Sequence, residues 1–159
     1  MHKNDPRNTR ITLNNTRVLK PPARLRMAQS LLTFIPANLP QPLGPYSHIA
    51  KAGQLITISA IAGMDPQTGK LVGPDAYSQA KQILRLCEVM LAEAESDFLH
   101  VVHINLFLKN MEHLDEVGRA YDEALGPDRP TGTVVAVSDL PKPGALVTMS
   151  LIAITRDAS

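Results

Sequence analysis

The sequence of 159 residues has one cysteine, no tryptophan, three tyrosines and three phenylalanines. A single cysteine excludes a disulfide within the chain and any zinc or iron–sulfur site built from several cysteines. So few aromatic side chains argue against a nucleic-acid surface on which bases stack. No stretch approaches the roughly 20 unbroken apolar residues of a membrane-spanning helix. The low cysteine content fits a reducing, cytoplasmic setting, in which we expect this protein.

The chain has the length and composition of one folded domain. Hydrophobic residues make up 44% of it and charged residues 19%, which excludes an intrinsically disordered chain. Its 9 glycines and 13 prolines are too scattered for collagen or for a low-complexity linker. We therefore expect a single hydrophobic core.

The net charge of +1 conceals two segments of opposite charge. Residues 1–26 carry seven basic side chains and one acidic side chain, whereas residues 27–159 carry 9 basic and 14 acidic ones. We expect residues 1–29 to be a basic, flexible extension and residues 30–159 to be the folded domain. Three interpretations of the extension stay open: an arm that binds RNA or another anion, an organelle-targeting presequence, or a segment upstream of a natural start at Met27.

The hydrophobic pattern of the folded part predicts strands and two amphipathic helices. The helices are expected at residues 76–94, after the N-cap Asp75, and at residues 114–125, before Gly126. Strands are expected at residues 31–35, 48–52, 55–60, 101–108, 133–137 and 146–155. This order predicts an α+β sandwich in which two helices cover one face of a mixed sheet.

The last expected strand is apolar on both faces, since Met149 and Leu151 alternate with Ile152 and Ile154. Two helices cover only one face of a sheet, so the other face needs a second cover. Self-association is the simplest source of that cover.

Alternation along residues 101–108 is expected to place Val102 and the following even-numbered residues on one face. His103 and the following odd-numbered residues then lie on the other face. His100 and His103 have the spacing of a metal-ligand pair, but positions i and i+3 of a strand point to opposite faces, so we expect no metal site. We expect His103 to be a hydrogen-bonded or solvated histidine, although it is also a titratable group near an interface. Cys87 lies on the apolar side of the first helix and is expected in the core.

Several short motifs stand in an order and at a spacing that is similar to one known family. In chain order they are Gly44-Pro45-Tyr46-Ser47, Ser59, Asp65-Pro66-Gln67-Thr68-Gly69, Val101-Val102, Phe107-Leu108-Lys109-Asn110-Met111, Pro130 and Leu140-Pro141-Lys142. Together they resemble the Rid family, the reactive-intermediate deaminases that are also called YjgF-like proteins and were formerly labelled L-PSP endoribonucleases. The resemblance covers residues 30–156.

The resemblance implies a chorismate-mutase-like α+β fold, a homotrimer packed through its sheets, and ligand clefts between the subunits. Family members with deaminase activity hydrolyse imines and enamines such as 2-aminoacrylate, and they use no metal or cofactor. In these relatives an arginine binds the substrate carboxylate and a glutamate helps to position water. The implied partners are a small-molecule ligand and further copies of the chain, without a membrane and without nucleic acid.

Carried onto this chain, the resemblance implies a binding site that contains Tyr46, Ser59, Gly132, Thr133 and Ser150. Tyr46 and Ser59 match the family's tyrosine and serine. Gly132 stands where deaminating relatives have the arginine, and Ser150 stands where they usually have the glutamate. Since both charged groups are missing, we expect altered chemistry, negligible 2-aminoacrylate hydrolysis and a ligand that is bulkier or less anionic.

Two other functions stay open at this point. The first is a non-catalytic small-molecule-binding or assembly protein on the same fold. The second is an action on RNA, against which the acidic balance of residues 27–159 argues, because phosphate contacts need lysine and arginine. If a carboxylate is bound in spite of Gly132, Arg129 is the first candidate for the cation that holds it.

Overall fold

The structure, a computed structural model, describes residues 30–157, so the expected basic extension lies outside the described residues. Its strands are β1 (Leu32–Phe34), β2 (Ile49–Ala52), β3 (Leu55–Ala62), β4 (Val101–Leu108), β5 (Thr131–Ala136) and β6 (Val147–Ile154). Its α-helices are α1 (Ala76–Glu93) and α2 (Leu114–Leu125). Single 3-10 turns, η2 (Phe98–His100) and η3 (Met111–His113), precede β4 and α2.

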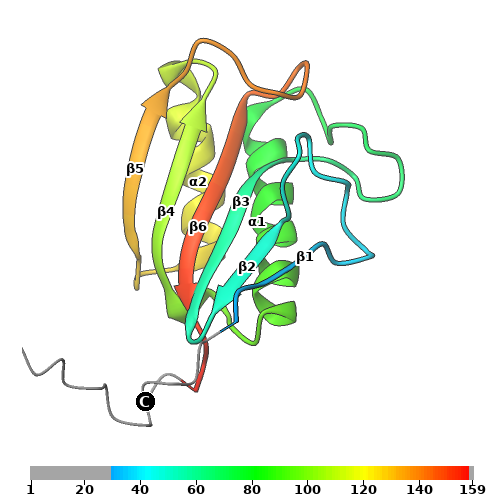
Figure 1. Ribbon diagram of the computed structural model, residues 1–159. Helices are drawn as coiled ribbons and strands as arrows, with labels where there is room; N and C mark the ends of the chain where they lie inside the picture. The colour runs from blue at the N-terminus through cyan, green and yellow to red at the C-terminus, as the bar shows by residue number, and fades with distance from the viewer. Residues whose placement is uncertain (1–29, 158–159) are drawn as a thin grey trace, which may run out of the picture.

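The six strands form one mixed sheet in the order β1-β2-β3-β6-β4-β5. β4 and β5 run parallel, and every other neighbouring pair is antiparallel. Both helices lie on one side of the sheet, behind it as drawn in Figure 1. We call that side the helix face and the other side the open face. The expected α+β fold, with two helices over one face of a mixed sheet, is confirmed.

Most element boundaries agree with the sequence pattern, but two expectations need correction. β5 begins at Thr131, two residues before the expected start of that strand. Val102 is 49% exposed and does not join Ile104 on the helix face. The pairing of β4 with β6 shifts between Val101 and His103, and this irregularity turns Val102 outward while Val101 is buried.

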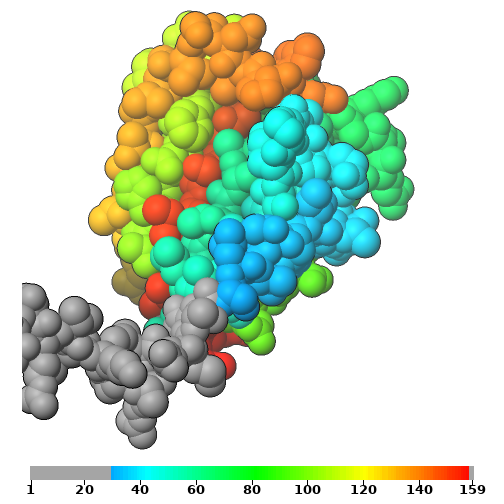
Figure 2. Space-filling view, in the orientation of Figure 1, coloured from blue at the N-terminus to red at the C-terminus, as the bar shows by residue number. Residues whose placement is uncertain are grey.

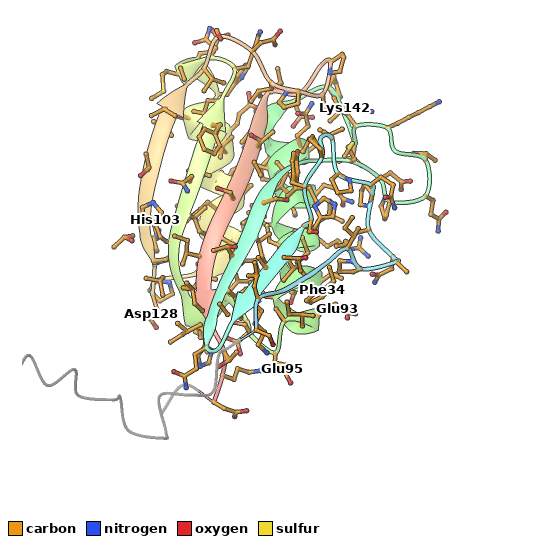
Figure 3. The ribbon with its side chains drawn as sticks, in the orientation of Figure 1. Phe34, Glu93, Glu95, His103, Asp128 and Lys142 are labelled. Carbon is orange, nitrogen blue, oxygen red and sulfur yellow. The ribbon has the colours of Figure 1, made fainter. Side chains whose placement is uncertain are left out.

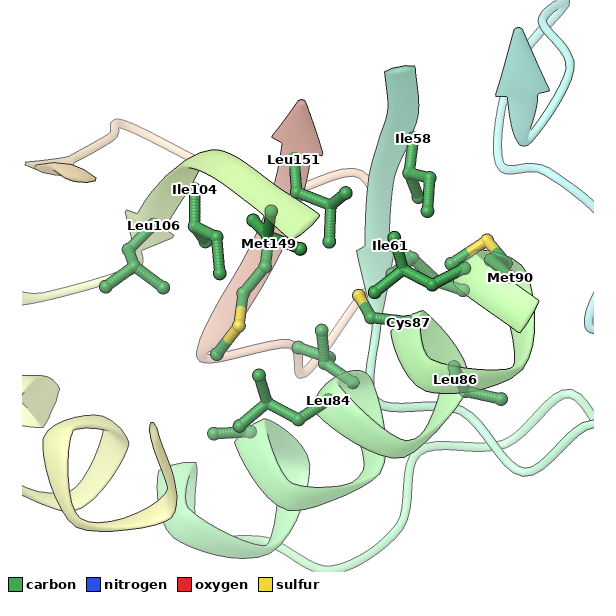
Figure 4. Close-up of a cluster of buried hydrophobic side chains, with 14 of the residues drawn as sticks. Ile58, Ile61, Leu84, Leu86, Cys87, Met90, Ile104, Leu106, Met149 and Leu151 are labelled. Carbon is green, nitrogen blue, oxygen red and sulfur yellow. The ribbon is translucent and has the colours of Figure 1, made fainter. Parts of the chain in front are cut away.

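The core lies between the helix face and α1. Figure 4 shows Cys87 and Met90 of α1 directed toward the sheet side chains Ile61 and Leu151. Cys87 is buried as expected, and this burial raises the pKa of its thiol to about 12. Gly63 permits the close approach of β3 to α1, because a Cβ there would collide with the backbone of Gln79.

The start of α1 is fixed by Asp75, as the sequence predicts. Its carboxylate accepts a hydrogen bond of 2.8 Å from the N–H of Ser78, which lowers the pKa of Asp75. Among residues 30–157, no helix is both long enough and apolar enough to span a bilayer.

Candidate ligand site on the open face

A row of polar side chains crosses the open face of the sheet. Strand pairing places these side chains next to one another, because paired residues share a face. They are His103 and Asn105 of β4, Thr131 and Thr133 of β5, and Ser150 of β6, and we call them the polar row. Figure 2 views the open face, with β5 in orange, β4 in yellow-green and β6 in red. His103 lies near the β5 edge of this face (Figure 3).

Hydrogen bonds join all members of the polar row. His103 Nδ1 lies 2.8 Å from Thr131 Oγ1. His103 Nε2 lies 3.1 Å from Asn105 Oδ1 and 3.2 Å from Thr133 Oγ1. The amide of Asn105 donates to Ser150 Oγ at 3.2 Å, so side chains of three adjacent strands are connected. Such a connected network fixes the orientation of its side chains, as a binding site requires.

Gly132 lies on β5, which is one of the two edge strands of the sheet and is exposed. Only alternate N–H groups of an edge strand bond to the neighbouring strand. Because the N–H of Val137 bonds to the Leu108 oxygen, the N–H of Gly132, an odd number of residues away, points away from β4. A Cβ placed on Gly132 would find its nearest neighbour, the Ile104 oxygen, at 3.5 Å. That distance is an ordinary contact, so this edge position has room for a side chain, which would leave the strand on the helix-face side because Gly132 pairs with Ile104.

Ser59 lies in the irregularity of β3 that stands opposite Ser150 of β6. Its hydroxyl oxygen is 3.1 Å from His48 Nδ1, and His48 Nε2 is 2.7 Å from the Pro40 carbonyl oxygen. A carbonyl can only accept, so Nε2 donates to it, and Nδ1 of the neutral ring then accepts from the Ser59 hydroxyl. His48 is only 2% exposed, so this arrangement belongs to the interior. The lone pairs of Ser59 are left to accept a hydrogen bond from a ligand.

Tyr46 lies in the loop that leads into β2, with its ring over Gly44. A Cβ on Gly44 would stand 2.5 Å from Cε1 of the ring, so this packing requires glycine. The side chain of Tyr46 is 42% exposed and takes part in none of the hydrogen bonds of the polar row. Tyr46 precedes His48, the hydrogen-bond partner of Ser59, by two residues in the chain.

An apolar hollow of about 250 Å³ adjoins the polar row. Its lining consists of Ala60, Phe107, Val137, Asp139, Leu140, Pro141 and Thr148. Phe107 and Thr148 follow Asn105 and precede Ser150 on their strands, so the hollow begins where the polar row ends. An apolar hollow beside a few fixed polar groups is typical of sites for small molecules.

The structure brings together some of the predicted site residues. Thr133 and Ser150 are joined through His103 and Asn105, and Ser59 stands opposite Ser150. Gly132 and Tyr46 contribute no hydrogen bond to this network.

His103 is hydrogen-bonded, as expected, whereas the contacts of Asn105 and His48 with candidate site residues were not predicted from the sequence. One signal was available, because His103 is the only ionisable residue in the expected strand 101–108. No comparable signal marks His48, since its link to Ser59 depends on the tertiary structure.

Arg129, the other candidate for holding a carboxylate, is engaged elsewhere. Its Nη2 lies 3.0 Å from Asp122 Oδ1 of α2, and its Nε donates to the Gly126 oxygen at 3.3 Å. These contacts hold the guanidinium at the end of α2 and not in the polar row. Within residues 30–157, no three His, Cys, Asp or Glu side chains gather as metal ligands.

Comparison with known proteins adds independent information. The sequence profile of the endoribonuclease L-PSP family matches residues 36–155. A RutC family protein of Pyrococcus abyssi is 33% identical over 114 residues, which are 72% of this chain and 89% of the relative. The human 2-iminobutanoate/2-iminopropanoate deaminase is 31% identical over 118 residues, 74% of this chain and 85% of the relative. The crystal structure of YyfA from Yersinia pestis, described as a Rid family protein, is 29% identical, has a TM-score of 0.74, and matches 79% of this chain and 100% of YyfA.

Proposed function

Because this chain belongs to the endoribonuclease L-PSP family, also known as the Rid family, we propose that it binds or hydrolyses a small reactive metabolite of the imine or enamine class. The observation that carries the proposal is the polar row, in which His103 and Asn105 hold Thr133 and Ser150 beside an apolar hollow. The name of the human relative supports the substrate class, since it describes a deaminase of 2-imino acids.

Hydrolysis of an imine adds water across the C=N bond and gives a carbinolamine, which then releases ammonia and leaves a 2-oxo acid. The protein has to orient that water and to stabilise the charge that develops on the reacting atoms. Ser59 and Ser150 are the hydroxyl groups that we assign to the water. Thr133 and the outward N–H of Gly132 are assigned to the ligand.

The proposed site differs from that of deaminating relatives in its charge. By the family resemblance, Gly132 and Ser150 stand where those relatives have arginine and glutamate. Neutral groups bind a carboxylate about 10- to 100-fold more weakly than a charge-assisted guanidinium pair does. Near neutral pH we therefore expect negligible hydrolysis of 2-aminoacrylate and a preference for a bulkier or less anionic metabolite, for which Gly132 leaves space.

The test compares kcat/KM on freshly generated 2-aminoacrylate for the wild type, Gly132→Arg, Ser150→Glu and the double variant. We expect the double variant to exceed either single variant, because the family resemblance implies that the two groups act together on one ligand and its water. The expected gain of the double variant over the wild type is about 10-fold or more. Wild-type turnover comparable to that of the human relative, assayed alongside, would overturn this proposal.

We also propose that the proteins assemble into a homotrimer through their open faces, as the family resemblance implies. Apolar residues of this face, Leu55, Val135 and Ile152, are each at least 36% exposed in the single chain, and assembly would bury them. The polar row would then lie in a cleft that a second subunit closes. Light scattering at micromolar concentration is the test, and a monomer would contradict the assembly.

A non-catalytic ligand-binding or assembly protein on the same fold is the second candidate. The absence of both charged groups, at Gly132 and Ser150, favours it. Binding of a 2-oxo acid without imine turnover, in the wild type and in the double variant alike, would assign this function.

A further inference from the structure

Ionisable residues are almost absent from the centre of the sheet. The strands β3, β4, β5 and β6 contain a single ionisable side chain, that of His103. It lies on the open face, beside β5 with Gly132, at the end of the polar row. Its charge state therefore sets the local charge of this part of the open face.

The hydrogen bonds of Thr131 fix one nitrogen of His103. The Thr131 hydroxyl donates to the Val102 carbonyl oxygen at 2.8 Å, and this bond uses its only hydrogen. The same oxygen is 2.8 Å from His103 Nδ1 and must accept there, so Nδ1 carries a hydrogen.

The second nitrogen, Nε2, faces Asn105 Oδ1 and Thr133 Oγ1. In the protonated ring, Nε2 donates to Asn105 Oδ1, and the Asn105 amide in turn donates to Ser150 Oγ. The hydroxyl hydrogens of Thr133 and Ser150 then remain available to a ligand. They give two hydroxyl donors joined through the network to a positively charged ring.

In the neutral ring, Nε2 has a lone pair and must accept. Either the Thr133 hydroxyl donates to it, or the Asn105 amide turns over and donates its N–H. In the second case Asn105 Oδ1 accepts from Ser150. Loss of one proton from His103 therefore removes a positive charge and also consumes a hydrogen-bond donor of the row.

We propose that the polar row is a binding site for the carboxylate of a small metabolite and that it is filled when His103 is protonated. The proposal rests on the function proposed above, in which the open face holds the ligand. When His103 is protonated, a carboxylate is the matching ligand because it accepts several hydrogen bonds and carries a negative charge. In this chain His103 takes the place of a permanent cation, so binding of the carboxylate and binding of a proton are coupled.

The side chains paired with His103 on the neighbouring strands are neutral, so protonation of His103 is what changes the charge at this point of the sheet. Its neighbours on β6 and β5 are Ile152, Thr131 and Thr133, all neutral. The connection that enters β5 contains Asp128, which lies below His103 in Figure 3. It also contains Arg129, which pairs with Asp122 of α2.

The experiment measures binding of 2-oxobutanoate, a 2-oxo acid of the kind that imine hydrolysis releases. Isothermal titration calorimetry at about pH 5.5 and about pH 8, on either side of the range in which histidines ordinarily titrate, gives the affinities. Titrations near neutral pH in two buffers of different ionisation enthalpy give the number of protons taken up. The variant is His103→Gln, and the matched control is His113→Gln, which lies before α2 and outside the sheet.

We expect the wild type and His113→Gln to bind about 10-fold more tightly at the lower pH and to take up protons on binding. His103→Gln should bind weakly at both pH values without proton uptake. Nitrogen NMR of the wild-type imidazole should show that the ligand favours the doubly protonated ring.

The proposal is overturned if His103→Gln keeps the pH dependence, if wild-type binding is independent of pH, or if 2-oxobutanoate does not bind at either pH. Imine turnover distinguishes the two levels of inference. If an imine is hydrolysed but binding takes up no protons, only the inference about His103 is wrong. If neither imine hydrolysis nor proton-coupled binding is seen, the proposed function is wrong as well.

Discussion

The two faces of β4 have the same backbone but different surroundings. On the helix face, Ile104 and Leu108 are buried against the helices. On the open face, His103 and Asn105 are only half-buried and form hydrogen bonds to neighbouring strands. Because successive residues of a strand point to opposite sides, one segment contributes to the core and to a polar surface at once. Stability is thus concentrated on one face, which leaves the other free to carry a site.

The two histidines that contact candidate site residues differ in their surroundings. His48 is almost fully buried, and both of its ring nitrogens have partners within the chain. His103 is more exposed, and its hydrogen bonds run across the surface of the sheet. A buried polar group that loses its hydrogen-bond partner lowers the stability of the folded protein, whereas an exposed group can bond to water in place of the lost partner. The first histidine therefore has a structural role in addition to holding Ser59, and the second is available to a ligand.

The largest effect is expected from matched isoleucines on the two faces. Ile104 is 1% exposed and Ile152 is 36% exposed. We expect Ile104→Ala to lower the free energy of unfolding by about 2–5 kcal/mol, because it leaves a cavity in the core. Ile152→Ala should lose less than half of that amount in the dilute protein. Urea denaturation of both variants at two protein concentrations checks this. If Ile104→Ala and Ile152→Ala lost equal amounts of unfolding free energy at both concentrations, the division between the faces would be contradicted.

A smaller effect is expected from the buried histidine. His48→Ala leaves the Pro40 carbonyl and the Ser59 hydroxyl without their partner, so we expect a loss of about 1–3 kcal/mol in the free energy of unfolding. His103→Ala serves as the comparison and should change the free energy of unfolding by about 0.5 kcal/mol or less. Chemical denaturation of both variants is the measurement. A larger loss in His103→Ala would mean that the polar row supports the fold and not a ligand.

The smallest effect is expected at the N-terminus of α1, away from the open face. The N–H of Ser78 donates to Asp75, so the pKa of Asp75 is lowered from its ordinary value of 3.8. The folded state thus binds the proton more weakly than the unfolded state, and this stabilisation is present above pH 3.8 and lost as the pH falls below it. Asp75→Asn keeps a capping side chain but does not titrate there. Thermal melts from neutral to acid pH should show a shallower acid decline in this variant, and an unchanged decline would assign it to other carboxylates.

Much of the architecture follows from the sequence pattern alone. The limits of α2 and β4, the cap Asp75 and the burial of Cys87 are as predicted, because periodic apolar residues, capping groups and turn residues act over a few neighbouring positions. The motifs from Gly44 to Lys142 also identify the family, as the match over residues 36–155 confirms.

Only the tertiary structure determines which residues, distant in sequence, become neighbours. β6 inserts between β3 and β4, and this order sets Ser150 opposite Ser59 and next to Asn105. A single irregularity in the register turned Val102 away from the core, and the carbonyl of Pro40, in the loop before β2, supplied a partner for His48. Pairing of segments distant in sequence depends on the packing of the whole domain, because a shift by one residue exchanges the faces of a strand without changing its local pattern. For that reason the sequence alone yielded the elements and the family of this protein, whereas the polar row arose from the register of three strands.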